Sequence, residues 1–265
     1  MVRTTLSVCL AALLTACGGG FSPPPSSPTP TPTVPISAAC GALGAVSSAT
    51  AITNGATCTT SNSPVVLINL RDADGNLSGA CSGTVIAPRA VLTAAHCLAQ
   101  TESARIFIGS GPQIDAESLH GFPGFREGDA NALDVGVMLF AEDIGTTIIP
   151  LLLSRDARVG ETAVVAGWGR DQIQSGSTLR AGSTTISAVG PILLQTEFST
   201  TNSSVCPGDS GGALLISEAG TWSLAGVISA NSTTSCAFGS NFYANVRNAQ
   251  VSAFILGLVP NVRRQ

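Results

Sequence analysis

Short apolar runs separated by turn-forming residues constrain the fold of this chain most strongly. Val91–Thr93 and Val227–Ser229 are typical of these runs, and in Leu133–Leu139 the apolar residues at positions 135, 137 and 139 alternate with their neighbours. A period of two indicates a strand with one buried face. Helix signals are sparse, and Thr, Ser, Val, Ile and Gly dominate, so the sequence predicts an all-β fold.

The composition supports a large packed core and argues against a nucleic-acid partner. The chain has 265 residues, of which 44% are hydrophobic and only 11% charged, and such a chain can bury enough apolar surface to fold. All 12 basic residues are arginine, and the formal net charge is −4. Because they form no basic stripe, we expect no nucleic-acid binding.

The N-terminal residues predict an export signal followed by a tether. Arg3 precedes the apolar run Val8–Leu14, which is too short to span a bilayer. The run ends at Leu-Thr-Ala-Cys, which resembles a bacterial lipoprotein signal. We therefore expect a signal peptide at 1–16, a lipid on Cys17, and an extended Pro/Ser/Thr-rich stalk over 17–39. The alternatives are an ordinary secretory signal with an incidental cysteine, and a Pro-rich ligand for a partner domain.

This reading predicts an exported protein held to a membrane by its N-terminal lipid, on the periplasmic or surface face of a bacterial cell envelope, or else secreted. The cysteines agree with an oxidising compartment. Of the eight, Cys9 leaves with the signal and Cys17 carries the lipid. Six remain, which allows about 15 pairings that sequence alone does not resolve. No Cys-x-x-Cys pair exists and only two histidines are present, so we expect no metal site.

Two motifs far apart in the chain carry the chemistry. Cys206–Gly212 places Ser210 between glycines, where a tight turn can expose the hydroxyl and backbone N–H groups can approach a carbonyl closely. Thr93–Cys97 contains His96 just after a predicted strand. Asp134 completes a Ser-His-Asp set, and we prefer it to Asp129 and Asp143 because the strand pattern follows it.

Together these motifs resemble the trypsin/chymotrypsin-like serine peptidase family. The resemblance covers about 52 to 259 and includes Gly167-Trp168-Gly169 and a helix-like pattern in Asn245–Leu258. It implies two packed antiparallel six-stranded β-barrels with a short C-terminal helix, a catalytic cleft between the barrels, and a tail at 260–265. It also implies a monomer that acts on a protein or peptide substrate without a cofactor.

The resemblance implies a role for each residue of the two motifs. His96 would be the general base, Asp134 would orient it, and Ser210 would be the nucleophile. The N–H groups of Gly208 and Ser210 would form the oxyanion hole. Ser229 resembles the family serine that donates a hydrogen bond to the catalytic aspartate.

The family pattern also pairs cysteines. It implies a Cys81–Cys97 disulfide beside the histidine and a Cys206–Cys236 disulfide between the serine loop and a wall of the substrate pocket. Cys40 and Cys58 are then left to pair with each other.

The resemblance further implies activation by cleavage. Ala51-Ile52-Thr53-Asn54-Gly55 resembles the N-terminus that this family frees, and Asp209 resembles the aspartate that pairs with the new ammonium group. We expect a propeptide segment at 40–51, a cut before Ile52, and a Cys40–Cys58 bridge that keeps the stalk attached. The alternative is that Ile52 simply begins the first strand.

The pocket residues predict the specificity. Ser204 stands where trypsins carry aspartate, which disfavours Arg or Lys at P1, the substrate residue before the scissile bond. Asn231 stands on one wall beside Ser229, and Asn241 or Ser240 on the other, where the family usually has glycine. We therefore expect small or medium uncharged P1 residues. Two rivals remain, a catalytically inactive binding module on the same fold and an esterase that uses the same triad.

Overall fold

In a computed structural model of the protein, the described part comprises residues 36–50, 55–59, 61–109, 111–129, 131–170, 178–233 and 235–265. The predicted signal peptide, the lipidation site Cys17 and the Ala51–Ile52 peptide bond lie outside these residues, as does most of the stalk. None of the helices in the described part is long and apolar enough to cross a membrane. The fold and the sites below belong to the compact unit formed by Thr31–Gln265.

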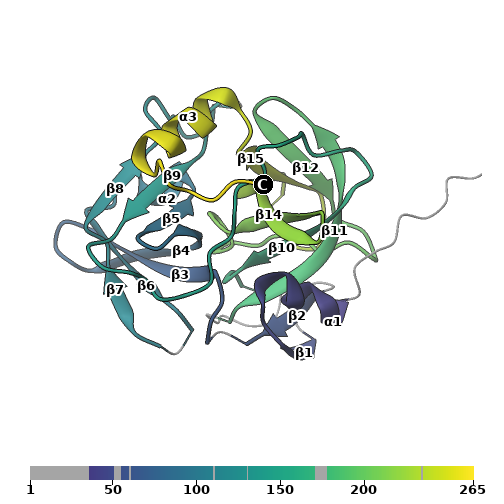
Figure 1. Ribbon diagram of the computed structural model, residues 1–265, viewed down its shortest axis with the longest axis horizontal. Helices are drawn as coiled ribbons and strands as arrows, with labels where there is room; N and C mark the ends of the chain where they lie inside the picture. The colour runs from purple at the N-terminus through teal and green to yellow at the C-terminus, as the bar shows by residue number, and fades with distance from the viewer. Residues whose placement is uncertain are drawn as a thin grey trace, which may run out of the picture. The chain divides into compact units, whose positions relative to one another are not determined.

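The first antiparallel sheet has seven strands in the order β7-β6-β3-β4-β5-β9-β8 (Figure 1). Its strands are β3 (Val65–Arg71), β4 (Leu77–Ala87), β5 (Ala90–Thr93), β6 (Ser103–Phe107), β7 (Gln113–Asp115), β8 (Ser118–Gly121) and β9 (Gly136–Leu139). The apolar residues Val65, Ile68 and Ile106 are completely or almost completely buried inside it. The predicted strand after Asp134 is therefore β9.

The second antiparallel sheet has eight strands in the order β1-β2-β11-β10-β13-β14-β15-β12. They are β1 (Ser47–Thr50), β2 (Gly55–Cys58), β10 (Thr162–Gly167), β11 (Arg180–Val189), β12 (Leu193–Glu197), β13 (Ala213–Glu218), β14 (Thr221–Asn231) and β15 (Ser240–Asn245). A further pairing of β11 with β12 closes six of these strands into a ring.

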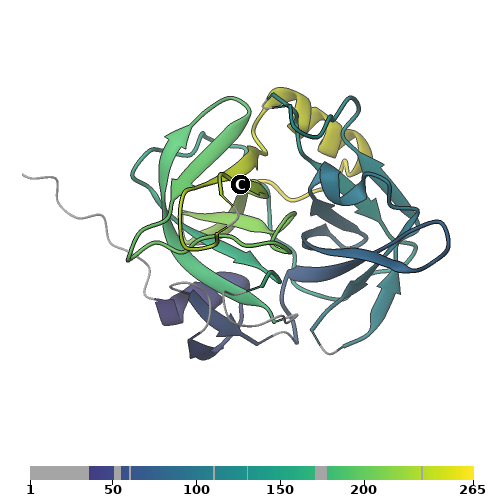
Figure 2. The ribbon, with the colours of Figure 1, turned by 180° about the vertical axis from the view of Figure 1, so that it is seen from behind.

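The predicted fold class is confirmed, and the strand count differs from six in an interpretable way. The closed ring of the second sheet contains six strands, and the hairpin of β1 and β2 extends the sheet by pairing with β11. The first sheet has seven strands, one more than expected, and the short β7 and β8 stand at its two ends. Both views of the ribbon show the two sheets side by side (Figure 2).

Trp168 joins the two sheets at the Gly-Trp-Gly motif. Its indole Nε1 donates to the carbonyl of Val65 at 3.0 Å, and its backbone N–H donates to Oγ of Ser82 at 2.8 Å. Since β10 ends at Gly167, these bonds attach the second sheet to β3 and β4 of the first. Such non-local hydrogen bonds help to hold the two sheets in a fixed relation.

The C-terminal helix α3 (Ala249–Leu258) is shorter at its start than the predicted Asn245–Leu258, because β15 continues to Asn245. Asn248 caps the helix, accepting hydrogen bonds from the backbone N–H groups of Gln250 and Val251. The helix packs on the first sheet, where Phe254 meets Phe122 edge to face at 5.3 Å between ring centroids (Figure 1).

The segment before the predicted cut is built into the domain. Residues of the short helices α1 (Ile36–Ala39) and η1 (Cys40–Leu43) are buried, with Cys40 and Leu43 0% and 1% exposed. The Cys40–Cys58 disulfide joins η1 to β2. Residues 40–50 therefore pack as part of the second sheet, whether or not the chain is cut beyond them.

Candidate active site

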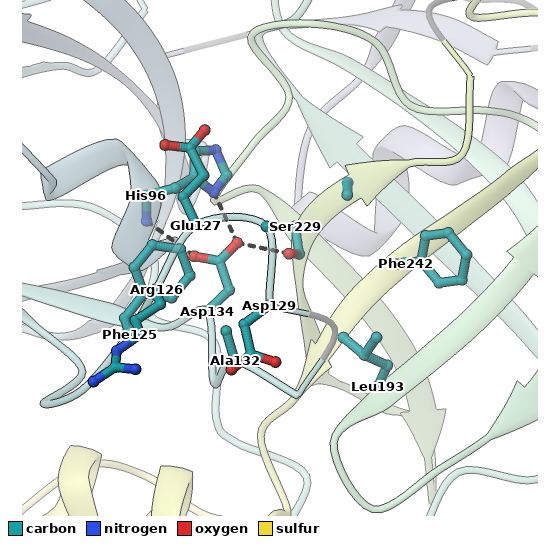
Figure 3. A pocket seen from close by; sticks show the side chains of 12 residues that line it. His96, Phe125, Arg126, Glu127, Asp129, Ala132, Asp134, Leu193, Ser229 and Phe242 are labelled. Atoms are coloured by element: carbon teal, nitrogen blue, oxygen red, sulfur yellow. Dashed lines mark hydrogen bonds and ion pairs between the residues drawn. The ribbon is translucent and has the colours of Figure 1, made fainter.

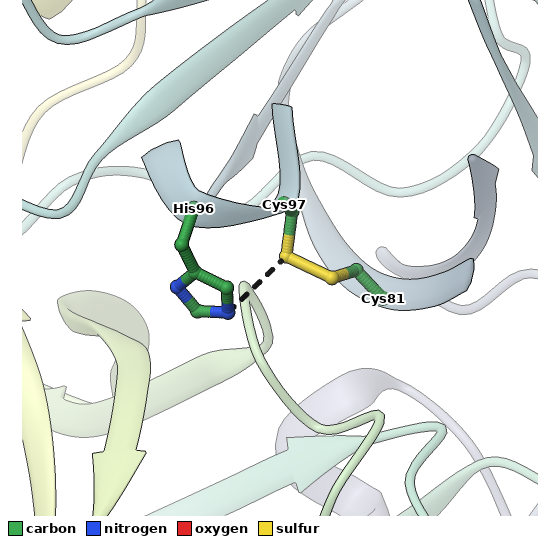
Figure 4. Close-up of side chains that lie close together, drawn as sticks. All are labelled: Cys81, His96 and Cys97. Carbon is green, nitrogen blue, oxygen red and sulfur yellow. Dashed lines mark hydrogen bonds between the residues drawn. A yellow bond between two sulfur atoms is a disulfide. The ribbon is translucent and has the colours of Figure 1, made fainter. Parts of the chain in front are cut away.

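The first sheet presents His96 immediately after a strand end. β5 ends at Thr93, and the single-turn helix α2 (Ala95–Leu98) carries the histidine. The Cys81–Cys97 disulfide fastens this turn to β4 (Figure 4). Because strand, turn and disulfide restrain its backbone, the imidazole has a rigid base.

Asp134 holds the histidine through two hydrogen bonds. Its Oδ1 accepts from the backbone N–H of His96 at 2.9 Å, and its Oδ2 lies 2.7 Å from Nδ1 of the ring. Ser229 donates its hydroxyl proton to the same Oδ2 at 2.6 Å. Ser229 lies where the pairing of β14 with β15 shifts register between Ile228 and Ala230, and such a bulge can turn a side chain out of the strand pattern.

Opposing effects set the charge states of this pair. Burial raises the pKa of Asp134, but the hydrogen bonds and charge of His96, together with the bond from Ser229, outweigh burial and hold it below its ordinary value. Burial lowers the pKa of His96, but the hydrogen bond and charge of Asp134, together with the charge of Glu127, leave it above its ordinary value. The arrangement therefore favours a carboxylate beside an imidazole that readily accepts a proton.

The loop Cys206–Gly212 leaves two N–H groups unpaired. Within it, the N–H of Asp209 bonds to the carbonyl of Cys206, and those of Gly211 and Gly212 bond to the carbonyls of Ile228 and Asp209. The N–H groups of Gly208 and Ser210 donate no hydrogen bond to any residue that the structure describes. They are the pair expected to form an oxyanion hole, and a positive φ of 96° at Gly208 shapes the loop around them.

Asp209 holds the loop Cys206–Gly212 in place through two backbone hydrogen bonds. Its Oδ1 accepts from the N–H of Gly169 at 2.7 Å and its Oδ2 from the N–H of Cys206 at 2.8 Å. A Cβ atom at Gly167 or Gly169 would collide with this carboxyl group, which explains both glycines of the Gly-Trp-Gly motif. Burial raises the pKa of Asp209 to about 6, against the opposing effect of the two N–H groups and the charge of Arg180.

Ser210 is the remaining member of the predicted triad. Its backbone carbonyl accepts from the N–H of Ser82 at 2.8 Å, which fixes the nucleophile loop against β4. No hydrogen bond joins its hydroxyl to His96 among the described residues; Nε2 of the ring lies 3.7 Å from Sγ of Cys97 instead (Figure 4). Contacts of this kind commonly tighten only when substrate is bound.

His96 and the two neighbouring cysteines are the one group of potential metal ligands in the described residues. Both sulfur atoms belong to the Cys81–Cys97 disulfide. Disulfide sulfurs are not the thiolates that bind zinc. The two sulfur atoms therefore serve to hold the turn that carries His96 against β4.

Comparison with known proteins matches this geometry to a family. The model of the family described as Trypsin matches residues 52–254, well over half of the chain. The chain belongs to the trypsin family. The match spans both sheets and all three members of the predicted triad.

The relatives of this trypsin-family chain include animal proteases. It is 26% identical to mouse vitamin K-dependent protein C over 57% of this chain and 40% of that protein. It is 27% identical to the CLIP domain-containing serine protease B9 of Anopheles gambiae over 62% of this chain and 52% of that protein. The chain thus spans about half, or less, of the length of these curated relatives.

A solved structure shares the fold. HL collagenase superposes with a TM-score of 0.62 over 74% of this chain and 93% of that one, at 20% sequence identity. At this identity the likeness shows the fold alone. It agrees with the two-barrel architecture of the trypsin-family domain.

A cavity lies beside Ser210, where the substrate pocket is predicted. This cavity of about 280 Å³ is lined by Val205, Cys206, Pro207, Ser210, Ile228, Ser229, Ala230, Asn231, Thr233 and Cys236. The Cys206–Cys236 disulfide forms part of its wall. Ser204, predicted to contact substrate, does not line this cavity and is 2% exposed.

A hydrogen-bonded group of three polar side chains accounts for the position of Ser204. Nδ2 of Asn231 donates to Oδ1 of Asn241 at 2.8 Å, and Oγ of Ser204 donates to the same oxygen at 2.9 Å. Sequence reasoning left Asn241 and Ser240 as equal candidates for the far wall. Asn241 forms this group, which we call the amide bridge, whereas Ser240 donates its hydroxyl proton to Glu197.

Sequence reasoning missed a larger hollow on the other side of His96. It has a volume of about 480 Å³ and contains Glu127 and Asp129 together with aromatic and aliphatic residues (Figure 3). The only sequence signal was two acids among glycines in the segment after Phe125. That pattern is also typical of an exposed turn, so it pointed to no site.

Proposed function

We propose that the protein is a serine endopeptidase that hydrolyses peptide bonds through an acyl-enzyme on Ser210. Its membership of a protease family and the hydrogen-bonded His96–Asp134 pair support this proposal. The oxygen of Ser210 attacks the scissile carbonyl carbon while Nε2 of His96 accepts the hydroxyl proton. The two unpaired N–H groups of Gly208 and Ser210 stabilise the negative charge that develops on the carbonyl oxygen.

The second half of the reaction uses the same residues. His96 gives its proton to the leaving amine as the C–N bond breaks, and the acyl group stays on Ser210. Water then attacks the ester, losing a proton to His96, and the proton returns to Ser210 as the acid product leaves. Asp134 remains ionised throughout and stabilises the imidazolium.

An open strand edge favours a peptide over a small ester as the substrate, and this observation carries the proposal. β14 pairs with β13 as far as Val227, but β14 continues to Asn231, where β15 is its only partner among the described strands. From Ser229 to Asn231 the other edge of β14 borders the cavity that contains Ser210. An extended peptide can add to such an edge as a further strand.

The amide bridge supports a preference for small or medium uncharged P1 residues. Its three polar groups satisfy one another, and Thr233 donates its backbone N–H to Oδ1 of Asn231 at 2.8 Å. Both ends of the Asn231 amide are thus occupied, and none of the described residues that line the cavity carries a charge that could bind Arg or Lys at P1. A large P1 side chain would have to break these hydrogen bonds and leave buried polar atoms unpaired. This free-energy cost disfavours a large P1 side chain relative to a small one.

We further propose that the protein is activated by a cut between Ala51 and Ile52. The paired strands β1 and β2 lie on either side of this position in the chain, and connections between elements are preferred sites of proteolytic cleavage. The new ammonium group would be a countercharge for Asp209, whose burial raises its pKa to about 6. The Cys40–Cys58 disulfide would keep the two pieces together.

The proposed location is outside the cytoplasm, with the chain attached to a membrane by a lipid on Cys17. The three disulfides support an exported, oxidising environment. The signal-like sequence up to Cys17 supports the lipid anchor. Metabolic labelling with a tagged fatty acid, with Cys17→Ser as the control, tests the anchor directly.

A fluorophosphonate experiment separates the enzyme from its rivals. We expect one covalent adduct on the reduced protein by intact mass, absent from Ser210→Ala, and faster turnover of extended peptides than of matched small esters. No adduct on a chain that begins at Ile52 would favour an inactive binding module, and ester turnover without peptide turnover would favour an esterase. No adduct on an uncut chain would identify an inactive precursor.

A further inference from the structure

The hollow next to His96 combines an apolar floor with an acidic rim. Phe125, Leu193 and Phe242 contribute apolar surface, whereas Glu127 and Asp129 contribute carboxylates. Figure 3 shows Glu127 at the end near His96, and Leu193 and Phe242 at the opposite end. Nothing in the proposed reaction uses these two acids, so the hollow requires its own explanation.

Glu127 is available to a ligand. Its side chain is exposed, and it forms no hydrogen bond or ion pair with any residue in the described part of the chain. Arg126 also lines the hollow, but Figure 3 shows its guanidinium directed away from Leu193 and Phe242. Asp129 has one oxygen occupied, since its Oδ1 accepts from the N–H of Asn131 at 2.8 Å.

The direction of a bound peptide determines which of its side chains meets Glu127. The hollow and the P1 cavity share Ser229 and Ala230, so they are neighbours along the open edge of β14. In an extended strand successive side chains point to opposite sides. If P1 enters its cavity, the preceding residue, P2, faces the side that contains His96 and Glu127.

We propose that Glu127 makes the enzyme select a basic residue, Lys or Arg, at P2 of its substrate. The aliphatic stem of such a side chain suits the apolar floor, and its charged head suits the carboxylate at the rim. This inference rests on the proposed peptidase function and adds a substrate feature to it. It makes the preferred cleavage site a basic residue followed by a small uncharged one.

The same carboxylate acts on the catalytic base. Asp134 and Glu127 are the two acids whose charges raise the pKa of His96. Loss of the Glu127 charge should therefore move the acid limb of the pH profile of kcat/KM to lower pH. This second readout is independent of the substrate side chain, and a purely structural role of Glu127 would not produce it.

The test compares Glu127→Gln with the unmodified protein on two peptides, each protein cut at Ala51–Ile52 with its Cys40–Cys58 disulfide intact. Both peptides have Ala at P1, and they carry Lys or the uncharged, straight-chain norleucine at P2. For the unmodified protein at low salt we expect a Lys/norleucine ratio of kcat/KM of about two to five, the range of an exposed ion pair. The ratio should fall to about one in Glu127→Gln, and also in the unmodified protein at high salt.

Glu142→Gln is the matched control, because Glu142 is exposed and does not line the hollow. It should keep the ratio of the unmodified protein. A ratio near one in the unmodified protein, an unchanged ratio in Glu127→Gln, or an equal loss in Glu142→Gln would overturn the inference while leaving the peptidase function intact. Absence of both peptide hydrolysis and fluorophosphonate labelling in protein cut at Ala51–Ile52 would overturn the two together.

Discussion

The two halves of the candidate site each depend on a buried aspartate, and the pKa values of these two residues shift in opposite directions. Burial acts against the ionised form of both. Asp134, in the first half, overcomes burial through His96 and Ser229 and has a lowered pKa. Asp209, in the second half, has two backbone N–H donors and the charge of Arg180, yet its pKa is raised to about 6.

This difference shows that the charge of the buried aspartate is compensated in the first half and not in the second. In the proposed reaction the partner of Asp134 is the base His96, which gains positive charge, so the Asp134 carboxylate is stabilised when it is needed. The nucleophile loop is held by a carboxylate that is costly to ionise in its present surroundings. An additional cation beside Asp209 would stabilise the second half much more than the first.

Removing the charge of Asp134 should lower kcat more than disturbing the oxyanion loop in the second half of the site. Asp134→Asn keeps the shape but favours the wrong tautomer of His96, and kcat should fall by a factor on the order of 10⁴. Steady-state kinetics with active-site titration measure the loss. A fall of less than tenfold in a folded variant would mean that Asp134 does not orient the base.

Disturbing the oxyanion loop should have the next largest effect. Gly208 has a φ of +96°, and a Cβ atom added to it would lie 3.1 Å from Cα of Gly169. Gly208→Ala should therefore displace the N–H of residue 208 and lower kcat by about 10²- to 10³-fold. Gly220→Ala is the control, because Gly220 also has a positive φ, of 80°, but open space around it. Equal losses of kcat in the two variants would contradict an oxyanion role for Gly208.

Opening the amide bridge should change specificity to a smaller degree. Combining Asn231→Gly with Asn241→Gly removes both side-chain amides and should raise kcat/KM for Phe at P1 by about tenfold relative to Ala. Ser204→Asp alone should not produce cleavage after Arg, because Ser204 lies outside the cavity. A peptide library profiled with each variant checks both statements, and Arg cleavage by Ser204→Asp would show that the bridge opens readily.

The pH dependence of stability should show the smallest effect. The pKa of Asp209 is about 6 in the folded chain and about 3.9 when unfolded, so the stability that this group contributes is present below pH 3.9 and is lost as the pH rises through 6. Asp134 has the opposite sign, because its lowered pKa stabilises the fold above its unfolded pKa and this stability is lost as the pH falls.

Chemical denaturation between pH 4 and 8 measures this effect in the uncut chain. Asp209→Asn should remove the decline in unfolding free energy between pH 4 and 6 that Asp209 causes, whatever constant offset the amide introduces. Cutting at Ala51–Ile52 should likewise reduce the decline if the new ammonium pairs with Asp209. An identical decline in cut and uncut protein would argue against that pairing.

The sequence alone determined the fold class and the residues from which a triad could be built, because those signals are local. Ser210 stands between glycines within one loop, His96 follows its own strand, and Asp134 precedes an alternating run. The helix pattern near the C-terminus was also local, although its start was predicted four residues early because Asn245 completes a strand.

The tertiary structure alone decided which side chains line the cavity beside Ser210 and which surround His96. The amide bridge joins Ser204, Asn231 and Asn241 from a loop and two strands, and only strand register and rotamer bring their polar atoms into contact. Glu127 likewise reaches His96 through the fold of a loop 31 residues further along the chain. Hydrogen bonds and charges act through space over a few ångströms, so a pattern read along one chain cannot specify them.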